Sequence, residues 1–463
     1  MQVDQFGLPI TAANAEAASH FNNAINSYFR FLRDTMVHVD AAINADPVMP
    51  MAQCLRGYLL LLATKREMAA LADDSIKATA AALEGVGGTD RERKYLAGLK
   101  LLNAGNILGA INVWEDILVD HPHDGLALKL AHYFYFMTGE ATKLRNSAAR
   151  VMPVWEESDS LYGHVLGIYA FGLQETGDYR AGEAAAKRAS EINPDDVYSI
   201  HSLTHVHEME GRYAEGADWI TSGAKHWTHC NNFRFHAWWH HCNFSIELGR
   251  FDDCLANLDA NVRPDNSSDD FRDTSSAASV LWRLEFEGVD VGDRWRELAD
   301  IAENRMNDHI LAYADSFAML ELVADDRDDA AKHLLKALRG IKTNADALES
   351  GIIVKVALPI CEALVAYKQG DFEKVVTLML PIRYDIRKLG GSHVQRDVFV
   401  QTLLQGAVKS GQHNLARALL SERVALKPKS SVSWKLFADT LEGAGEADAA
   451  KDARDKARLL LAA

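Results

Sequence analysis

The chain has 463 residues, more than the roughly 250–300 at which a single hydrophobic core stops growing, so it forms several domains or an elongated array of repeats. Hydrophobic residues make up 48% and charged residues 25%, and there are only 10 prolines, which predicts a folded and nearly all-helical protein. The formal net charge is −16 and no cluster of Lys and Arg is visible, so we expect no nucleic acid partner.

The N-terminal segment has neither the basic region nor the apolar region of a secretory signal. No run approaches the roughly 18 apolar residues that a membrane-spanning helix needs, so no membrane partner is expected. The five cysteines are scattered and include no Cys-x-x-Cys pair, which favours a reducing compartment over a disulfide framework. These features predict a cytoplasmic protein.

Three segments of the chain share one pattern. Gly105, Gly177 and Gly411 each precede a stretch of amphipathic helix, and a proline follows each glycine after 17 positions. Glycine ends a helix where the backbone turns, and proline cannot continue one, so the pattern predicts helical hairpins. From Gly177 to Gly211 is 34 residues, and this spacing resembles the tetratricopeptide repeat (TPR), a helix–turn–helix unit of that length.

Hairpins of this kind leave an apolar face uncovered, so consecutive hairpins stack. The predicted fold class is therefore all-α: a right-handed superhelix of TPR-like helical hairpins, or α-solenoid. We expect residues 1–90 to form an N-terminal helical cap and residues 91–463 to form the superhelix, continuous with the cap. Residues 259–273, rich in Asn, Asp and Ser, are the expected long loop over the concave groove.

The most unusual local feature is a concentration of histidine: eight of the 18 histidines lie between positions 201 and 241. Four of them form two pairs spaced by four residues, His201/His205 and His236/His240. Residues four apart stand on the same face of a helix. We expect helices over residues 196–210 and 233–248, and adjacent inner-wall helices would bring both pairs together.

Polar signatures outside the repeat occur along the whole chain. In order, they are Phe6-Gly7-Leu8-Pro9, Asp120-His121-Pro122, Ala131-His132, Gly167-Ile168-Tyr169, Gly172-Leu173-x-Glu175, His205-Val206-His207-Glu208-Met209, Leu284-x-x-Glu287-Gly288-Val289, Asp308-His309-Ile310-Leu311, Pro381-Ile382-Arg383-Tyr384, Leu389-Gly390-Gly391-Ser392 and Gln395-Arg396-Asp397-Val398-Phe399. This ordered set resembles the tetratricopeptide repeat protein 38 family from end to end. The resemblance implies the TPR fold and a shared site, but no settled reaction. Besides the paired histidines and Glu208, it marks His132, Trp239, His309, Asp315, Arg396 and Asp397, which we expect to bind substrate.

Several kinds of chemistry fit the paired histidines. Four imidazoles beside a carboxylate suit zinc, iron or copper, so His201, His205, His236 and His240 are candidate ligands of a divalent metal. Imidazole also titrates near neutral pH, so the same four residues, supported by Glu208, are candidates for metal-free acid–base catalysis. The sequence contains no nucleotide cofactor motif.

Two functions remain open from the sequence. The first is an intracellular enzyme that acts on a small polar or anionic metabolite by acid–base or metal-assisted chemistry in a His-rich concave pocket. The alternative is a non-catalytic TPR adaptor that binds a peptide or a protein partner in its concave groove.

Overall fold

The computed structural model describes residues 2–344 and 347–461. These residues form two compact units. Unit 1 contains residues 1–203, 225–234 and 342–351, and unit 2 contains residues 204–224, 235–341 and 352–463. Residues on both sides of position 90 belong to unit 1, and the division into cap and superhelix stays a prediction.

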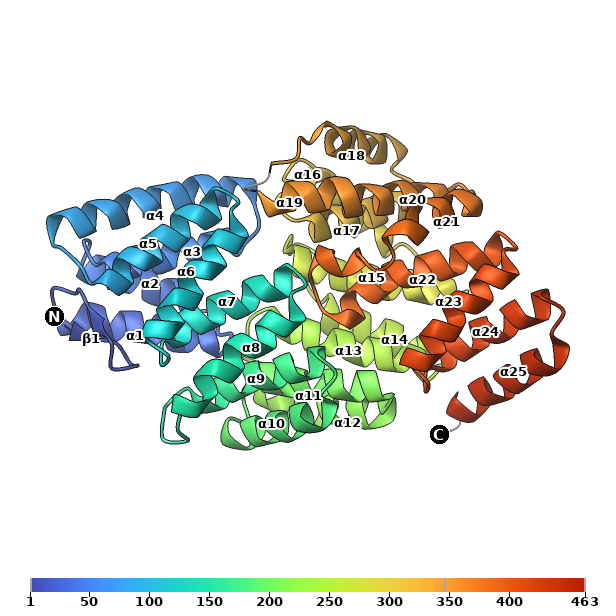
Figure 1. Ribbon diagram of the computed structural model, residues 1–463, viewed down its shortest axis with the longest axis horizontal. Coiled ribbons are helices and arrows are strands. Elements are labelled where there is room, and N and C mark those ends of the chain that lie inside the picture. The colour runs from blue at the N-terminus through green and yellow to red at the C-terminus, as the bar shows by residue number, and fades with distance from the viewer. Residues whose placement is uncertain (1, 345–346, 462–463) are drawn as a thin grey trace. The chain divides into compact units, whose positions relative to one another are not determined.

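Unit 1 begins with a small antiparallel pair of strands, β1 (Gln2–Val3) and β2 (Pro9–Ile10), and is otherwise helical in its described part. Consecutive helices pack as pairs, as α3 does with α4 and α9 with α10 (Figure 1). Its helices are α1 (Ala15–Phe29), α2 (Thr35–Ala45), α3 (Pro50–Leu61), α4 (Arg66–Gly85), α5 (Asp90–Asn103), α6 (Ile107–Asp120), α7 (Gly125–Met137), α8 (Ala141–Val151), η1 (Met152–Val154), α9 (Tyr162–Glu175) and α10 (Tyr179–Ile192).

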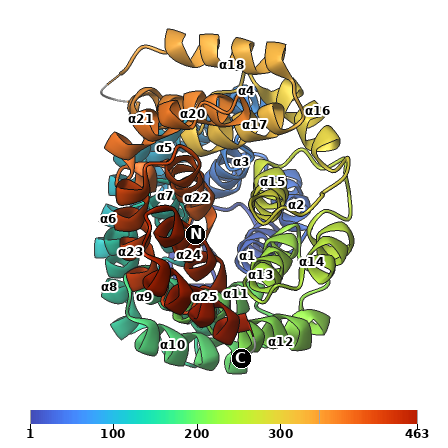
Figure 2. The same ribbon diagram turned by 90° about the vertical axis from the view of Figure 1, so that its right-hand side faces the viewer.

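Among the described helices, the unit boundaries fall within α11 (Val197–Glu210), η2 (Ala224–His226), α13 (Phe233–Glu247) and α19 (Leu348–Ile352). In unit 2, α15, α17, α20 and α22 pack against one another, and α24 lies against α25 (Figure 2). The other helices after α11 are α12 (Tyr213–Gly223), α14 (Phe251–Asn257), η3 (Leu258–Val262), α15 (Phe271–Phe286), α16 (Trp295–Arg305), α17 (Ala312–Ala324), α18 (Asp328–Gly340), η4 (Ile353–Ala357), α20 (Leu358–Lys368), α21 (Phe372–Met379), η5 (Leu380–Ile382), η6 (Ile386–Leu389), α22 (His393–Lys409), α23 (His413–Leu426), α24 (Ser431–Gly443) and α25 (Ala447–Leu461).

The predicted hairpin turns are confirmed. Gly105, Gly177 and Gly411 stand between α5 and α6, α9 and α10, and α22 and α23, with φ angles of 79°, 85° and 71°. This left-handed conformation is strained for residues with a Cβ atom, which is why glycine ends the first helix of each hairpin. The fold class is confirmed as well: the chain is all-α and consists of TPR-like hairpins.

In the core of unit 1, the polar atoms of the large side chains Tyr58 and Trp114 are hydrogen-bonded. The Tyr58 hydroxyl donates to the Tyr95 carbonyl at 2.6 Å and accepts from Trp114 Nε1 at 3.1 Å. Gly98 lies against this group, and a Cβ atom there would come within 2.8 Å of the Tyr58 oxygen. The absence of a side chain at Gly98 therefore lets the aromatic cluster approach the helix backbone.

Lys129 is buried in the same unit. Its Nζ atom donates to the Phe29 carbonyl at 3.2 Å and lies 4.7, 4.8 and 4.1 Å from the ring centres of Tyr28, Phe29 and Phe31. Burial lowers the pKa of Lys129 to about 7, and the carboxylate of Asp196 only partly opposes this. The ammonium form is therefore destabilised in the folded chain.

We expect Lys129→Met to raise the free energy of unfolding by about 2–4 kcal/mol at pH 7. Between the folded pKa of about 7 and the usual value of 10.5, the unfolded chain holds a proton that the folded chain has released, so the wild type gains stability as pH rises. The advantage of the variant should therefore shrink across this window. Urea unfolding at several pH values measures it, and a variant less stable than the wild type at pH 7 would contradict it. Lys187→Met, at an exposed lysine of α10, is the control.

Contrary to expectation, the described chain contains one helical run that is long and apolar enough to cross a membrane. Residues Leu348–Lys368 form a continuous helical run of 21 residues with a mean hydropathy of 1.7, long and apolar enough to cross a membrane. Half of its apolar window is buried, and core helices of soluble proteins share this composition. This run is therefore only weak evidence of a membrane-spanning helix.

The predicted long loop is shorter than expected. Residues 258–262 form the π-helical turn η3 and α15 begins at Phe271, so irregular backbone covers only residues 263–270. Arg263 holds this segment, because its guanidinium donates to the Asn266 and Ser268 carbonyls at 3.3 and 2.9 Å and binds the Glu297 carboxylate at 2.8 Å.

Candidate functional site

Three of the predicted histidines converge in unit 2. His205 comes from α11, and His236 and His240 come from α13. Their ligating nitrogens lie within 4.8 Å of one another. The ring centres of His205 and His240 are 4.4 Å apart, and those of His236 and His240 are 5.2 Å apart. The convergence of these three residues, here called the histidine cluster, is confirmed.

The fourth paired histidine, His201, lies one turn before His205 on α11, in the part of this helix that belongs to unit 1. Its ring is stacked on Phe171 at 5.5 Å and meets Phe233 edge-on at 5.0 Å. In unit 1 it therefore packs among aromatic side chains, while its position on the helix face matches that of His205.

The histidine cluster is largely shielded from solvent. His240 is 0% exposed and His205 is 1% exposed, while His236 is only partly buried. Trp239 stacks on His236 with ring centres 4.9 Å apart, and its Nε1 donates to Ser279 Oγ at 2.7 Å. The stacking and the hydrogen bond hold Trp239 in place beside His236, the most accessible of the three imidazoles.

Burial keeps the imidazoles of His205 and His236 uncharged. It lowers the pKa of His236 to about 3, and the nearby cation of Arg272 adds to the effect. Burial also holds the pKa of His205 well below the usual value, and His236, His393 and Lys427 act in the same direction. At neutral pH both rings are therefore neutral, and one nitrogen of each ring carries a lone pair.

A small polar cavity lies one turn further along the same two helices. Its volume is about 20 Å³, and its lining includes Glu208, three residues after His205, and Asn243, three residues after His240. Glu208 Oε1 accepts from Lys427 Nζ at 3.2 Å. Glu208 Oε2 and Asn243 Oδ1 are buried and accept no hydrogen bond from the described residues. A cavity of this size has room for about one water molecule.

The other side of this cavity is a buried ionic network. The Arg423 guanidinium binds the Asp397 carboxylate through both oxygens, at 2.7 and 2.9 Å. Burial would raise the pKa of Asp397, but the cations of Arg423 and Lys427 outweigh it and hold the pKa far below the usual value. For Glu247 burial prevails and raises the pKa to about 7. The network therefore holds one firmly ionised carboxylate and one that titrates near neutral pH.

The other predicted substrate-binding residues form local pairs. His132 belongs to unit 1, where its Nε2 lies 2.5 Å from the Tyr198 hydroxyl. In unit 2, His309 Nδ1 lies 3.0 Å from Asp315 Oδ1, and Arg396 donates to the carbonyl of Gly391. Their roles in binding a substrate stay predictions.

A row of polar side chains on α1 was not expected from the sequence. Asn23, Asn26 and Arg30 are spaced by three and four residues, which places them on one helix face. This spacing can be recognised in the sequence. It indicates a binding site only once the fold has placed other polar residues opposite this helix face.

No family model matches this chain. Solved structures similar to it include the human IFIT1 dimer with m7Gppp-AAAA, at 13% identity and a TM-score of 0.40, covering 98% of this chain and 96% of that one. The TPR domain of P58(IPK) is similar at 14% identity and a TM-score of 0.23, covering 81% and 98%. Naa15/Naa10 bound to HypK-THB is similar at 11% identity and a TM-score of 0.25, covering 96% and 63%.

The chain's own hairpins, with their left-handed glycines and 34-residue spacing, are those of TPR proteins. The fold is of TPR type. The similar structures are all less than 15% identical to the chain, so their ligands and partners are not carried over to it. The expected lack of a nucleic acid partner stays a prediction.

Proposed function

We propose that this TPR-type protein is a metal-dependent enzyme that binds a divalent transition metal through His205, His236 and His240. The observation that carries the proposal is the convergence of three imidazole nitrogens within 4.8 Å in a buried place. Catalytic zinc sites commonly have three protein ligands and leave one position for water or substrate. The role of His201 as a fourth ligand stays a prediction from the sequence.

The distances are close to those of a metal site. Each Zn–N bond is about 2.1 Å, so two nitrogens on one ion lie no more than about 4.2 Å apart. The upper limit of 4.8 Å among the cluster nitrogens exceeds this by about 0.6 Å, and rotations of the side chains can close that difference. Nitrogen ligands suit zinc, iron and copper better than magnesium or calcium, which prefer oxygen.

The protonation state of the cluster favours metal binding over metal-free acid–base catalysis. A metal ligand must be a neutral imidazole, and the lowered pKa values of His205 and His236 provide this at neutral pH. A general base works best with a pKa near the working pH, whereas an imidazole of pKa about 3 is a weak base and has no proton to donate.

The charge of a divalent ion also needs compensation in a buried place. Glu208 supplies a carboxylate one turn from His205, and its Oε2 accepts no hydrogen bond from the described residues. Arg272, the cation that lowers the pKa of His236, is itself paired with Asp270, with Nε 2.8 Å from Oδ1.

A small polar or anionic metabolite is the proposed substrate class. It would reach the cluster from the side of His236, which is the only one of these three imidazoles that is not fully buried. We further infer membership of the tetratricopeptide repeat protein 38 family from its ordered motifs, a cytoplasmic location, and no nucleotide cofactor. These inferences depend on the sequence signatures.

Metal analysis of the full chain, purified without chelators and reloaded with Zn²⁺, Fe²⁺ or Cu²⁺, tests the proposal. We expect about one equivalent of one of these metals per chain, retained through gel filtration. Less than about a tenth of an equivalent of every metal would overturn it. The second candidate function, a protein-binding adaptor, is favoured by the TPR-type hairpins, and would then become the leading hypothesis.

A further inference from the structure

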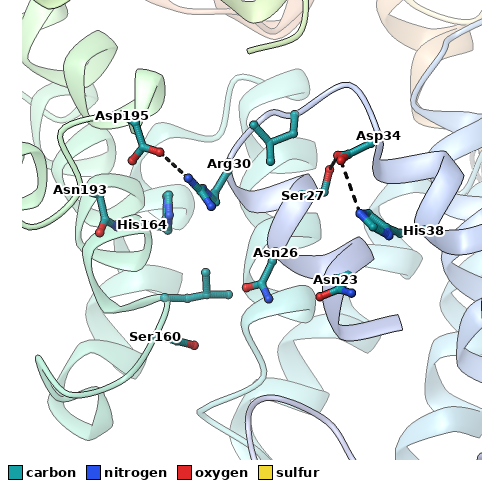
Figure 3. Close-up of a pocket in the computed structure, with 12 residues that line it drawn as sticks. Asn23, Asn26, Ser27, Arg30, Asp34, His38, Ser160, His164, Asn193 and Asp195 are labelled. Atoms are coloured by element: carbon teal, nitrogen blue, oxygen red, sulfur yellow. Dashed lines mark hydrogen bonds and ion pairs between the residues drawn. The ribbon is translucent and has the colours of Figure 1, made fainter. Parts of the chain in front are cut away.

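Unit 1 contains a polar cavity that is separate from the histidine cluster. It lies between α1, the start of α2, the turn before α9 and the turn before α11, as Figure 3 shows. Its volume is about 660 Å³. Binding sites for small molecules typically measure about 300–1,000 Å³, so the cavity is large enough for a compact metabolite.

The charged side chains of this cavity already neutralise one another. The Arg30 guanidinium forms an ion pair with the Asp195 carboxylate. The Asp34 carboxylate accepts from Ser27 Oγ at 2.5 Å and faces His38 Nε2 at 3.4 Å (Figure 3). The hydrogen bond from Ser27 lowers the pKa of Asp34 below its usual value, so this carboxylate remains ionised. A charged ligand would have to compete with these partners.

The neutral polar groups of the cavity, by contrast, are available for a ligand. Among the described residues, the side chains of Asn23, Asn26 and Ser160 form no hydrogen bond within the protein, although all three line the cavity. Asn193 also lines it, and its Nδ2 is buried with no hydrogen-bond acceptor. Amides both donate and accept hydrogen bonds, so three of them around one cavity match a ligand whose groups do the same.

We propose that this cavity binds a neutral polyhydroxylated small molecule of the sugar or cyclitol class. Each hydroxyl of such a ligand donates and accepts, so it can satisfy Asn23, Asn26 and Asn193 without breaking the Arg30–Asp195 pair.

Calorimetric titration and ligand-observed NMR on the full chain test this site. The neutral probes are D-glucose, trehalose and myo-inositol, and the charged probes are inorganic phosphate and spermidine. We expect saturable binding of at least one neutral probe, with both charged probes weaker. Absence of saturable binding for all three neutral probes, or tighter binding of a charged probe, would overturn the proposal.

Two variants locate the binding. Asn26→Leu and Asn193→Ala each remove an amide of intermediate exposure, and the Nδ2 atom of Asn193 is buried. Each should weaken the neutral probe about tenfold, the effect of losing one or two good hydrogen bonds. Asn44→Leu, at an exposed amide of α2 outside the cavity, is the matched control and should bind as the wild type does. Wild-type affinity in both cavity variants would contradict the assignment, and thermal unfolding confirms that each variant is folded.

Discussion

Replacing His240 by glutamine is expected to weaken zinc binding by at least about 100-fold, because this residue is the centre of the histidine cluster. Its ring lies 4.4 Å from that of His205 and 5.2 Å from that of His236, so its loss removes the imidazole that contacts both of the others. Glutamine keeps much of the side-chain volume, which limits the cavity left by a fully buried ring. Competition with a chromogenic chelator measures the affinity.

The neighbouring histidine provides the matched control. His241 is only partly buried, and its ring lies against Trp238 with centres 5.6 Å apart, about 100° around the helix from His240. His241→Gln should therefore keep wild-type zinc affinity. Equal zinc affinity in the wild type, His240→Gln and His241→Gln would show that any bound metal lies elsewhere.

Replacing Asp397 by alanine is expected to lower the free energy of unfolding by about 3–5 kcal/mol at pH 7. The change removes the two carboxylate oxygens that accept from Arg423 Nη1 and Nη2, and this carboxylate also lies 4.0 Å from Lys427 Nζ. The buried cations of Arg423 and Lys427 would then lack this carboxylate as a counter-charge. Urea unfolding, monitored by circular dichroism, measures the loss.

The pH dependence gives a second measurement. The folded pKa of Asp397 lies below the unfolded value of 3.8, so its stabilising effect is complete above that value and is lost as pH falls through the folded pKa. The gap between the wild type and Asp397→Ala should therefore shrink below about pH 4. A gap that stayed constant into the acid range would contradict the assignment to an ionised carboxylate.

Asp385→Ala is the control for this experiment. Asp385 forms an ion pair with Lys388 at 2.8 Å, but its side chain is 49% exposed. Exposed pairs of this kind contribute little, so the free energy of unfolding should change by no more than about 0.5 kcal/mol. A loss as large as that of Asp397→Ala would show that burial is not the cause.

Local sequence patterns were sufficient for the helices that carry the site. The expected helices over residues 196–210 and 233–248 are observed as Val197–Glu210 and Phe233–Glu247. Glycine and proline limit helices through the conformation of their own backbone, so their effect can be recognised without knowing the fold. The same is true of the spacing of four that places His236 and His240 on one face.

The segment after α14 shows where local composition misleads. Residues 259–273 are rich in loop-forming side chains, yet the first four are helical and α15 begins at Phe271. Packing of Val262 and of the α15 face against the core outweighs the weak preference of Asn, Asp and Ser for turns.

The sequence by itself determined the hairpins, the two histidine pairs and the face on which each pair stands, because these depend on residues within a few positions of one another. Only the tertiary structure decided which groups meet across long separations. Lys427 binds Glu208 over 219 positions, and Arg30 binds Asp195 over 165. The pKa of Lys129 likewise depends on rings from α1 and the turn after it. Burial and distant partners fix these properties, and neither is encoded in local spacing.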